Sequence, residues 1–202
     1  MTLRLMFLGD RICGGTSAYS KVGYEVCTRL SKLGHSIAHI PMGRANNMGK
    51  QGFEKVLIYP SGQDWFAEDV AAQHYVDFKA DMLITIKEPW VFNDVFRWAI
   101  NFVPFAVIDH SPVSAAITSR LDTAFKVIAI SRHGQMELRR KNISSEYIPH
   151  GIRCDLYKPL EDKAACRKLF YLEPDDFVVG VVAMNRARKM IPHMLRGYKR
   201  FL

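Results

Sequence analysis

Paired cysteines and metal-binding spacings are missing from this sequence of 202 residues. Its four cysteines, at positions 13, 27, 154 and 166, form no C-x-x-C pair and no spacing typical of a metal site. Structural disulfides are rare in reducing compartments, where isolated thiols persist. We therefore expect free thiols that serve packing more than chemistry.

Long apolar runs and a secretion signal are also missing. The longest apolar run, from 98 to 108, is interrupted by Asn101 and Pro104, so no membrane-spanning segment is predicted. The N-terminus does not show the charged and then apolar design of a signal peptide. We expect a cytoplasmic protein, and we discount the glycosylation pattern Asn142-Ile143-Ser144 for that reason.

The glycine-rich stretch near the N-terminus lacks the two common nucleotide-binding motifs. Gly9-x4-Gly14-Gly15-Thr16 differs from a P-loop because Gly15 stands where that motif needs a phosphate-binding lysine. No G-x-G-x-x-G fingerprint of a dinucleotide-binding fold follows the first apolar run either. The sequence therefore argues against an NTPase.

What the N-terminal stretch does contain is the order strand, glycine loop, helix. An apolar run over 3–8 predicts a buried parallel strand, and Thr16 or Ser17 can cap the helix that ends at Gly34. Gly14-Gly15 precedes that helix, where free N–H groups and the helix dipole attract an anion or a hydroxyl-rich ligand. A tight strand-to-helix turn without any ligand is the alternative explanation.

Strands and helices alternate along most of the chain, which is 49% hydrophobic and long enough to bury a core. This order predicts an α/β fold, a Rossmann-like parallel sheet flanked by helices, with ligands at the carboxyl ends of the strands. The further strands are predicted at 36–40, 56–59, 82–86, 105–108 and 127–130, and the further helices at 64–78, 90–100, 115–124 and 135–141.

Three segments are predicted along the chain. Residues 1–157 form the Rossmann-like domain, and 158–176 form a linker with a short helix. Residues 177–202 contain an apolar strand over 177–182 and a basic helix from about Pro192, which is typical of the opening of a second α/β domain.

A net charge of +8 and an isoelectric point near 9.4 favour an anionic partner. Nucleic acid, acidic lipid headgroups and a nucleotide-linked substrate are the candidates, and nucleic acid ranks low because no recognition motif accompanies the charge. The basic residues cluster at 139–141 and from 186 to 200. A solvated helix face remains the alternative for each cluster.

Six segments of the sequence together form a recognisable pattern. They are Gly14-Gly15-Thr16-Ser17-Ala18-Tyr19, Leu33-Gly34-His35, Val127-Ile128-Ala129-Ile130-Ser131-Arg132, Tyr147-Ile148-Pro149-His150-Gly151-Ile152-Arg153, Tyr157-Lys158-Pro159, and Val179-Gly180-Val181-Val182-Ala183-Met184-Asn185 with Arg188-Lys189. Together they resemble group 1 (family 4) retaining glycosyltransferases of the GT-B fold. The I-P-H-G segment and the later Arg-Lys pair are the more specific part of the resemblance, which covers nearly the whole chain.

The resemblance implies that the first domain binds the acceptor and that the second binds most of a nucleotide sugar, with the reaction in the cleft between them. It implies that Gly14 and Gly15 face the donor and that Thr16 and Tyr19 contact the acceptor. It also implies that His110, in Asp-His-Ser-Pro after a predicted strand, is the active-site histidine that contacts the transferred sugar. A capping or packed histidine is the alternative for that position.

Arg188 and Lys189 are implied to bind the donor diphosphate, so that no metal is required. Met184 stands where many members carry an arginine, so Arg186 or Arg188 would take that contact. The family's acidic E-x7-E motif is not in these residues, so we expect the N-terminal part of the enzyme, inactive alone. The expected whole enzyme is a hexosyltransferase-type retaining glycosyltransferase whose acceptor is an unidentified carbohydrate, lipid or protein.

The alternative function is a non-catalytic sugar- or nucleotide-binding regulatory module with the same fold. In either case the basic clusters allow peripheral contact with an anionic membrane, and we expect no nucleic-acid partner.

Overall fold

The computed structural model describes residues 1–43, 49–93 and 100–202 of the chain. It divides into two compact units, Met1–Gly151 and Ile152–Leu202, and each is described by itself. No helix in the described residues is both long enough and apolar enough to cross a bilayer.

The first unit is built around one mostly parallel sheet. The strand order is β3-β4-β2-β1-β5-β6-β7-β8, and only the β3–β4 pair is antiparallel. The order reverses at β1, which has β2 on one side and β5 on the other, and ligands of such sheets bind beyond the carboxyl ends of the strands at this point. The strands are β1 Arg4–Gly9, β2 Ser36–Pro41, β3 Gln51–Phe53, β4 Val56–Ile58, β5 Met82–Ile86, β6 Phe102–Ala106, β7 Ile128–Ala129 and β8 Glu146–Tyr147.

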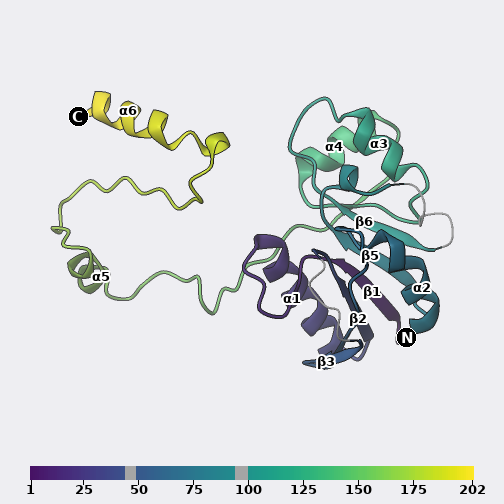
Figure 1. Ribbon diagram of the computed structural model, residues 1–202. Coiled ribbons are helices and arrows are strands. Elements are labelled where there is room, and N and C mark those ends of the chain that lie inside the picture. The colour runs from purple at the N-terminus through teal and green to yellow at the C-terminus, as the bar shows by residue number, and fades with distance from the viewer. Residues whose placement is uncertain (44–48, 94–99) are drawn as a thin grey trace. The chain divides into compact units, whose positions relative to one another are not determined.

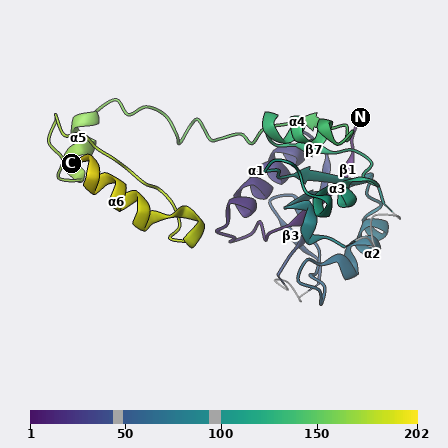
Figure 2. The ribbon, with the colours of Figure 1, turned by 90° about the horizontal axis from the view of Figure 1, so that it is seen from above.

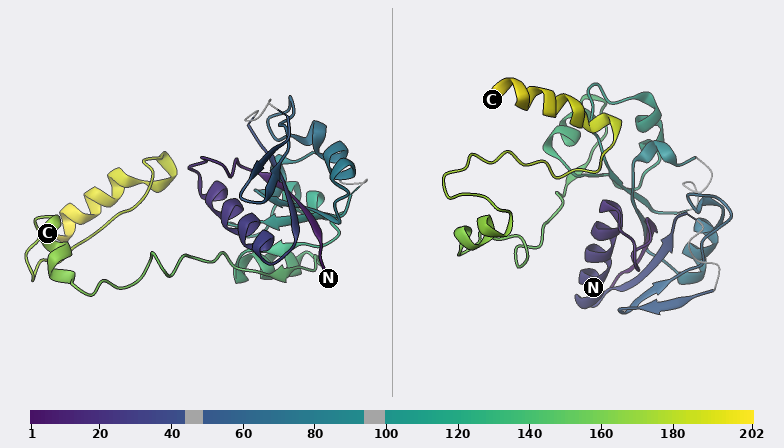
Figure 3. Two further views of the ribbon diagram at one scale, coloured as in Figure 1. Left: turned by 90° about the horizontal axis from the view of Figure 1, so that it is seen from below. Right: turned by 60° about the vertical axis from the view of Figure 1, so that its left-hand side comes forward.

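Helices cover both faces of the sheet, as the parallel arrangement requires. Helix α1 (Ala18–Lys32) and helix α2 (Glu68–Phe78) lie on opposite sides of the strands (Figure 1; Figure 3, left). Successive residues of β1 alternate between them, because Phe7 packs in one core with Cys27 of α1 and Leu8 in the other with Ala71 of α2. Every residue of β1 after the first is buried, so the α/β prediction is confirmed.

Two shorter helices complete the core at the other end of the sheet. They are α3 (Ala115–Leu121) and α4 (Arg132–Arg140). Leu121 of α3 and Leu138 of α4 pack with Ala129 of β7. This third cluster fixes the loops that follow β6 and β7.

The ends of α1 follow the predicted signals. The side chain of Ser17 accepts a hydrogen bond from the N–H of Ser20, so Ser17 is the N-cap. Gly34 has φ = +93°, the left-handed conformation that terminates many helices, and its N–H bonds to the carbonyl of Ser31. Both predicted boundaries are confirmed.

Several predicted boundaries are wrong by two to four residues. Helix α3 ends at Leu121 instead of 124, α4 begins at Arg132 instead of 135, and the short strand β8 was not predicted. The strand predicted at 105–108 occupies Phe102–Ala106 and includes Pro104, which is tolerated because the pairing of β7 with β6 starts only at Phe105. The helix predicted from 64 begins at Glu68, because Ala67 has a left-handed φ of 57° and cannot continue a helix backwards.

The edge strand β3 was not predicted. It pairs with β4 through a tight turn in which Glu54 and Lys55 have φ of 45° and 65°. Such turns usually have the sequence Asn-Gly or Asp-Gly, and neither occurs here. The helix predicted at 90–100 falls largely on 94–99, outside the described residues, and the part before them forms the short 3-10 helix η1 (Pro89–Val91).

The second unit contains helix α5 (Lys163–Leu169), the 3-10 helix η3 (Ala187–Lys189) and helix α6 (Ile191–Phe201), seen side-on in Figure 2. Helix α6 confirms the basic helix predicted from about Pro192. The strand predicted at 177–182 is not formed, and Val182 is fully exposed. A parallel strand needs a neighbour for its hydrogen bonds, and the described residues of this unit provide none.

His39 is an ionisable residue inside the core. It lies on β2, is 2% exposed, and its ring nitrogens form no hydrogen bond of normal geometry in the described part of the chain. Burial lowers the pKa of His39 to about 4, and the nearby backbone and carboxylate of Asp10 offset only part of that effect. The native state therefore holds this imidazole neutral.

We predict that His39 makes the protein lose stability as pH falls. Between its ordinary pKa of 6.5 and about 4, the unfolded chain takes up a proton that the native state does not, so the free energy of unfolding decreases by at most about 3 kcal/mol. Urea unfolding at about pH 7 and about pH 4.5 measures the difference in the free energy of unfolding between the two pH values. This difference should be smaller for His39→Leu than for the wild type. His193→Leu, on the exposed α6, is the control and should keep the wild-type difference.

Candidate functional site

The candidate site lies where β1 and β5 end, at the point where the strand order reverses. Asp10 follows β1 directly and Lys87 follows β5 directly. The Lys87 Nζ atom is 3.0 Å from Asp10 Oδ1, and the two side chains are only about one-fifth exposed. Partial burial screens this ion pair less than a surface pair, so it joins the two strand ends firmly.

The same carboxylate holds the start of α1. The hydroxyl of Ser17 donates a hydrogen bond of 2.5 Å to Asp10 Oδ2 while it accepts one of 2.9 Å from the N–H of Ser20. One side chain therefore caps the helix and ties it to the end of β1. Bonds to an ionised acceptor are shorter and stronger than neutral ones, which suits this role.

Tyr19, in the first turn of α1, reaches across to the residues after β5. The ammonium of Lys87 lies 4.7 Å from the centre of the Tyr19 ring, and the Tyr19 hydroxyl donates to Glu88 Oε1 at 2.7 Å. Burial first, and then the hydrogen bond and charge of Glu88, raise the pKa of Tyr19. The phenol thus stays protonated, a hydrogen-bond donor beside a carboxylate.

The glycine turn between β1 and α1 is as tight as its sequence suggests. Gly14 has φ = +70°, and a Cβ atom on Gly15 would lie 2.0 Å from the carbonyl oxygen of Arg11 and 2.3 Å from Ser20 Oγ. Only a residue without a side chain fits there. The turn geometry accounts for both glycines, and it leaves Gly14 and Thr16 exposed at the edge of the sheet.

His110 lies on the loop that follows β6. Its Nδ1 is 3.0 Å from Asp109 Oδ1, and its Nε2 accepts a bond of 3.3 Å from the N–H of Ser114. These partners assign the proton to Nδ1 in the neutral ring. The charge of Asp109 also helps to raise the pKa of Tyr19, so this loop is within electrostatic reach of α1.

A buried carboxylate on α4 supports the loop of His110. Glu137 is 1% exposed and pairs with Arg140. Burial acts to raise the pKa of Glu137, but hydrogen bonds from the Ser111 side chain and the Val113 backbone, with the charge of Arg140, outweigh it and lower the pKa. The loop is therefore anchored directly after His110.

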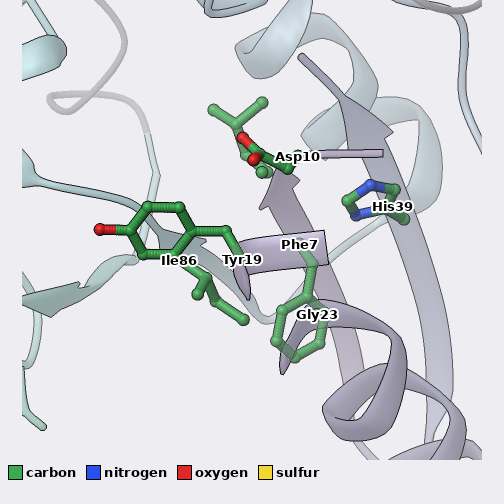
Figure 4. Close-up of a pocket in the computed structure, with 8 residues that line it drawn as sticks. Phe7, Asp10, Tyr19, Gly23, His39 and Ile86 are labelled. Atoms are coloured by element: carbon green, nitrogen blue, oxygen red, sulfur yellow. The ribbon is translucent and has the colours of Figure 1, made fainter. Parts of the chain in front are cut away.

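The cavity next to Asp10 and Tyr19 is small. A cavity of about 10 Å³, enough for one water molecule, lies among residues of β1, α1, β2 and β5. In the view of Figure 4, Tyr19 and His39 lie on opposite sides of Asp10. The lining residues are Phe7, Leu8, Gly9, Asp10, Tyr19, Gly23, His39 and Ile86. A ligand of any size would bind over the exposed edge of the sheet.

The residues predicted from the sequence fall into two groups. Gly14, Gly15 and Thr16 lie in the β1–α1 connection, and Tyr19 lies in the first turn of α1. His110 follows β6, whose carboxyl end lies at the same edge of the sheet. Arg188 and Lys189 belong to the second unit, in η3, where both are exposed.

Sequence reasoning missed Asp10, Lys87 and Glu88. Asp10 and Lys87 are charged residues directly after a strand, and Glu88 is one residue further on. In the described part of the chain, no three His, Cys, Asp or Glu side chains are grouped so that they could hold a metal ion.

The fold and the site together define a class: an α/β protein with a Rossmann-like, mostly parallel sheet and a polar cluster at its switch point. No protein-family model matches the chain, and no curated protein matches it either.

We predict that Gly15→Ala destabilises the first unit, because the new methyl group would meet backbone that cannot move away. Overpacking of this kind costs about 1–3 kcal/mol in the free energy of unfolding. Gly52→Ala is the matched control, since a Cβ there has no neighbour within 4 Å. Denaturant unfolding should separate the two variants, and equal stability would mean that the turn is looser than described.

Proposed function

We propose that this chain is the acceptor-side part of a retaining glycosyltransferase that uses a nucleoside diphosphate sugar. The acceptor would lie over the carboxyl edge of the sheet in the first unit. The donor would be held mainly by a second α/β domain, to which η3 and α6 belong in this proposal.

One observation carries the proposal. The glycine turn with Tyr19, and the loop with His110, stand at the carboxyl edge of one sheet whose strand order reverses at β1. Ligands of open α/β sheets collect at this edge. Tyr19 with Glu88, and His110 with Asp109, present paired donors and acceptors there, which suits the hydroxyl groups of a sugar.

The chemistry gives His110 and the basic pair distinct roles. His110, partly exposed on its loop, would contact the sugar being transferred. Arg188 and Lys189 would lie against the diphosphate, whose negative charge grows as it leaves. Fixed cations at that position stabilise the transition state more than the ground state. Metal participation is not required by this arrangement.

We predict that Arg188→Ala with Lys189→Ala weakens binding of a nucleoside diphosphate to the chain. Charge-assisted bonds contribute about 1.5–3 kcal/mol each, so a loss of about a hundredfold or more is expected when both are removed. Ligand-observed NMR with UDP, GDP and ADP, each beside its nucleoside, measures the effect. The control is Lys199→Ala with Arg200→Ala, which removes the same charge from α6; an equal loss in both double variants would contradict a diphosphate site.

The next prediction concerns a chain that also carries the paired glutamates of a donor domain. We predict that His110→Ala in this chain strongly lowers the rate of sugar transfer while it changes the free energy of unfolding little. A fixed contact to the reacting group typically contributes about a hundredfold to a thousandfold in rate. Ser114→Ala is the control, because the Ser114 side chain makes no capping bond on the same loop. Nucleotide-sugar binding without any transfer by the wild type would favour the non-catalytic module instead.

A further inference from the structure

A basic groove lies on the face of α4 that the candidate site does not use. It is an open hollow of about 570 Å³ between the helix and the segment that follows it, within the usual size of small-molecule sites. Eight residues line it: Arg132, Gln135, Met136, Arg139, Asn142, Ile143, Ser144 and Ser145.

The helix places two arginines along this groove. Arg132 and Arg139 are seven positions apart in the sequence, which on a helix is about two turns, so both lie on the same side. Gln135 and Met136 lie between them on that side. Glu137 and Leu138 are buried against the protein on the other side of the helix.

Both arginines are available to an anion. The Arg132 guanidinium stacks 4.4 Å from the centre of the Tyr147 ring. The ring covers one flat face of the guanidinium, so the N–H groups in the guanidinium plane can still donate to an anion. In the described residues neither Arg132 nor Arg139 forms an ion pair. The acidic residue beside the groove, Glu146, is compensated by Lys126 at 3.1 Å.

The far wall of the groove is held in place and is polar. Gln135 Nε2 donates to the Ser145 carbonyl at 3.1 Å, and the N–H of Asn142 bonds to the Arg139 carbonyl at 3.0 Å. Ser144 on this wall is exposed, whereas the Ser145 hydroxyl is buried and has no hydrogen-bond partner in the described structure. Met136, 48% exposed, adds an apolar surface beside these polar groups.

We propose that this groove binds the phosphate ester of a polyol, either a free sugar phosphate or a phospholipid headgroup. Paired guanidinium groups bind phosphate oxygens through two hydrogen bonds each, and the Ser144 hydroxyl and the side-chain amides suit hydroxyl groups. The groove does not depend on the proposed transferase function, because none of its residues belongs to the candidate site.

Calorimetric titration with glucose 1-phosphate, beside glucose, tests the phosphate requirement on the whole chain. We expect glucose 1-phosphate to bind and glucose not to bind. Arg139→Gln should lower the affinity for glucose 1-phosphate about tenfold, in line with the loss of one charge-assisted bond. Arg29→Gln on α1 removes the same charge from an exposed helix and should bind as the wild type does. Circular dichroism checks that each variant is folded.

Co-sedimentation with vesicles separates the two sources of phosphate. Binding to phosphatidylglycerol mixed with phosphatidylcholine, but not to phosphatidylcholine alone, and its loss in Arg139→Gln would assign a headgroup. Binding of glucose 1-phosphate without vesicle binding would assign a free sugar phosphate. The proposal is overturned if folded Arg139→Gln keeps wild-type affinity for both probes, if Arg29→Gln weakens binding equally, or if neither probe binds the wild type.

Discussion

The carboxylate of Asp10 is the group on which the carboxyl edge of the sheet depends. It accepts the Ser17 hydroxyl at 2.5 Å and pairs with Lys87 at 3.0 Å, so it joins the end of β1, the start of α1 and the residue after β5. Without it, Lys87 would keep a mostly buried charge with no ion pair among the described residues, and the helix cap would lose its fixed position. Tyr19 and Glu88 are placed by the same arrangement, because Lys87 lies over the Tyr19 ring.

Much of the fold could be predicted because its signals are local. Strand β5 was predicted with the bounds that it has, since a short apolar run bounded by polar residues is the local pattern of a buried parallel strand. The strand at 177–182 failed for the opposite reason. An apolar run becomes a strand only beside another strand, and sequence composition does not show whether a partner is present. The edge strand β3 was missed because Glu54 and Lys55 make its turn without the usual residues.

The features of the candidate site also differ in whether they depend on nearby or on distant residues of the sequence. The glycine turn was visible in the sequence, since a close approach of backbone demands glycine whatever the surroundings. The ion pair between Asp10 and Lys87 was not visible, because its members are 77 positions apart. They meet only because the parallel register places Gly9 beside Ile86, so that the residues following these two strands emerge together. Strand order and register are therefore needed to find such a pair.

Helix α4 shows how fold geometry divides a charge cluster that looks uniform in the sequence. Arg139, Arg140 and Lys141 are adjacent in the chain, but successive residues of a helix point about 100° apart. Arg140 turns toward Glu137 and helps to keep that buried carboxylate ionised, which anchors the loop of His110. Arg139 turns to the other side and lines the groove with Arg132. One short helix thus supports the candidate site with one face and presents an independent anion-binding surface with the other, so the two can be altered separately.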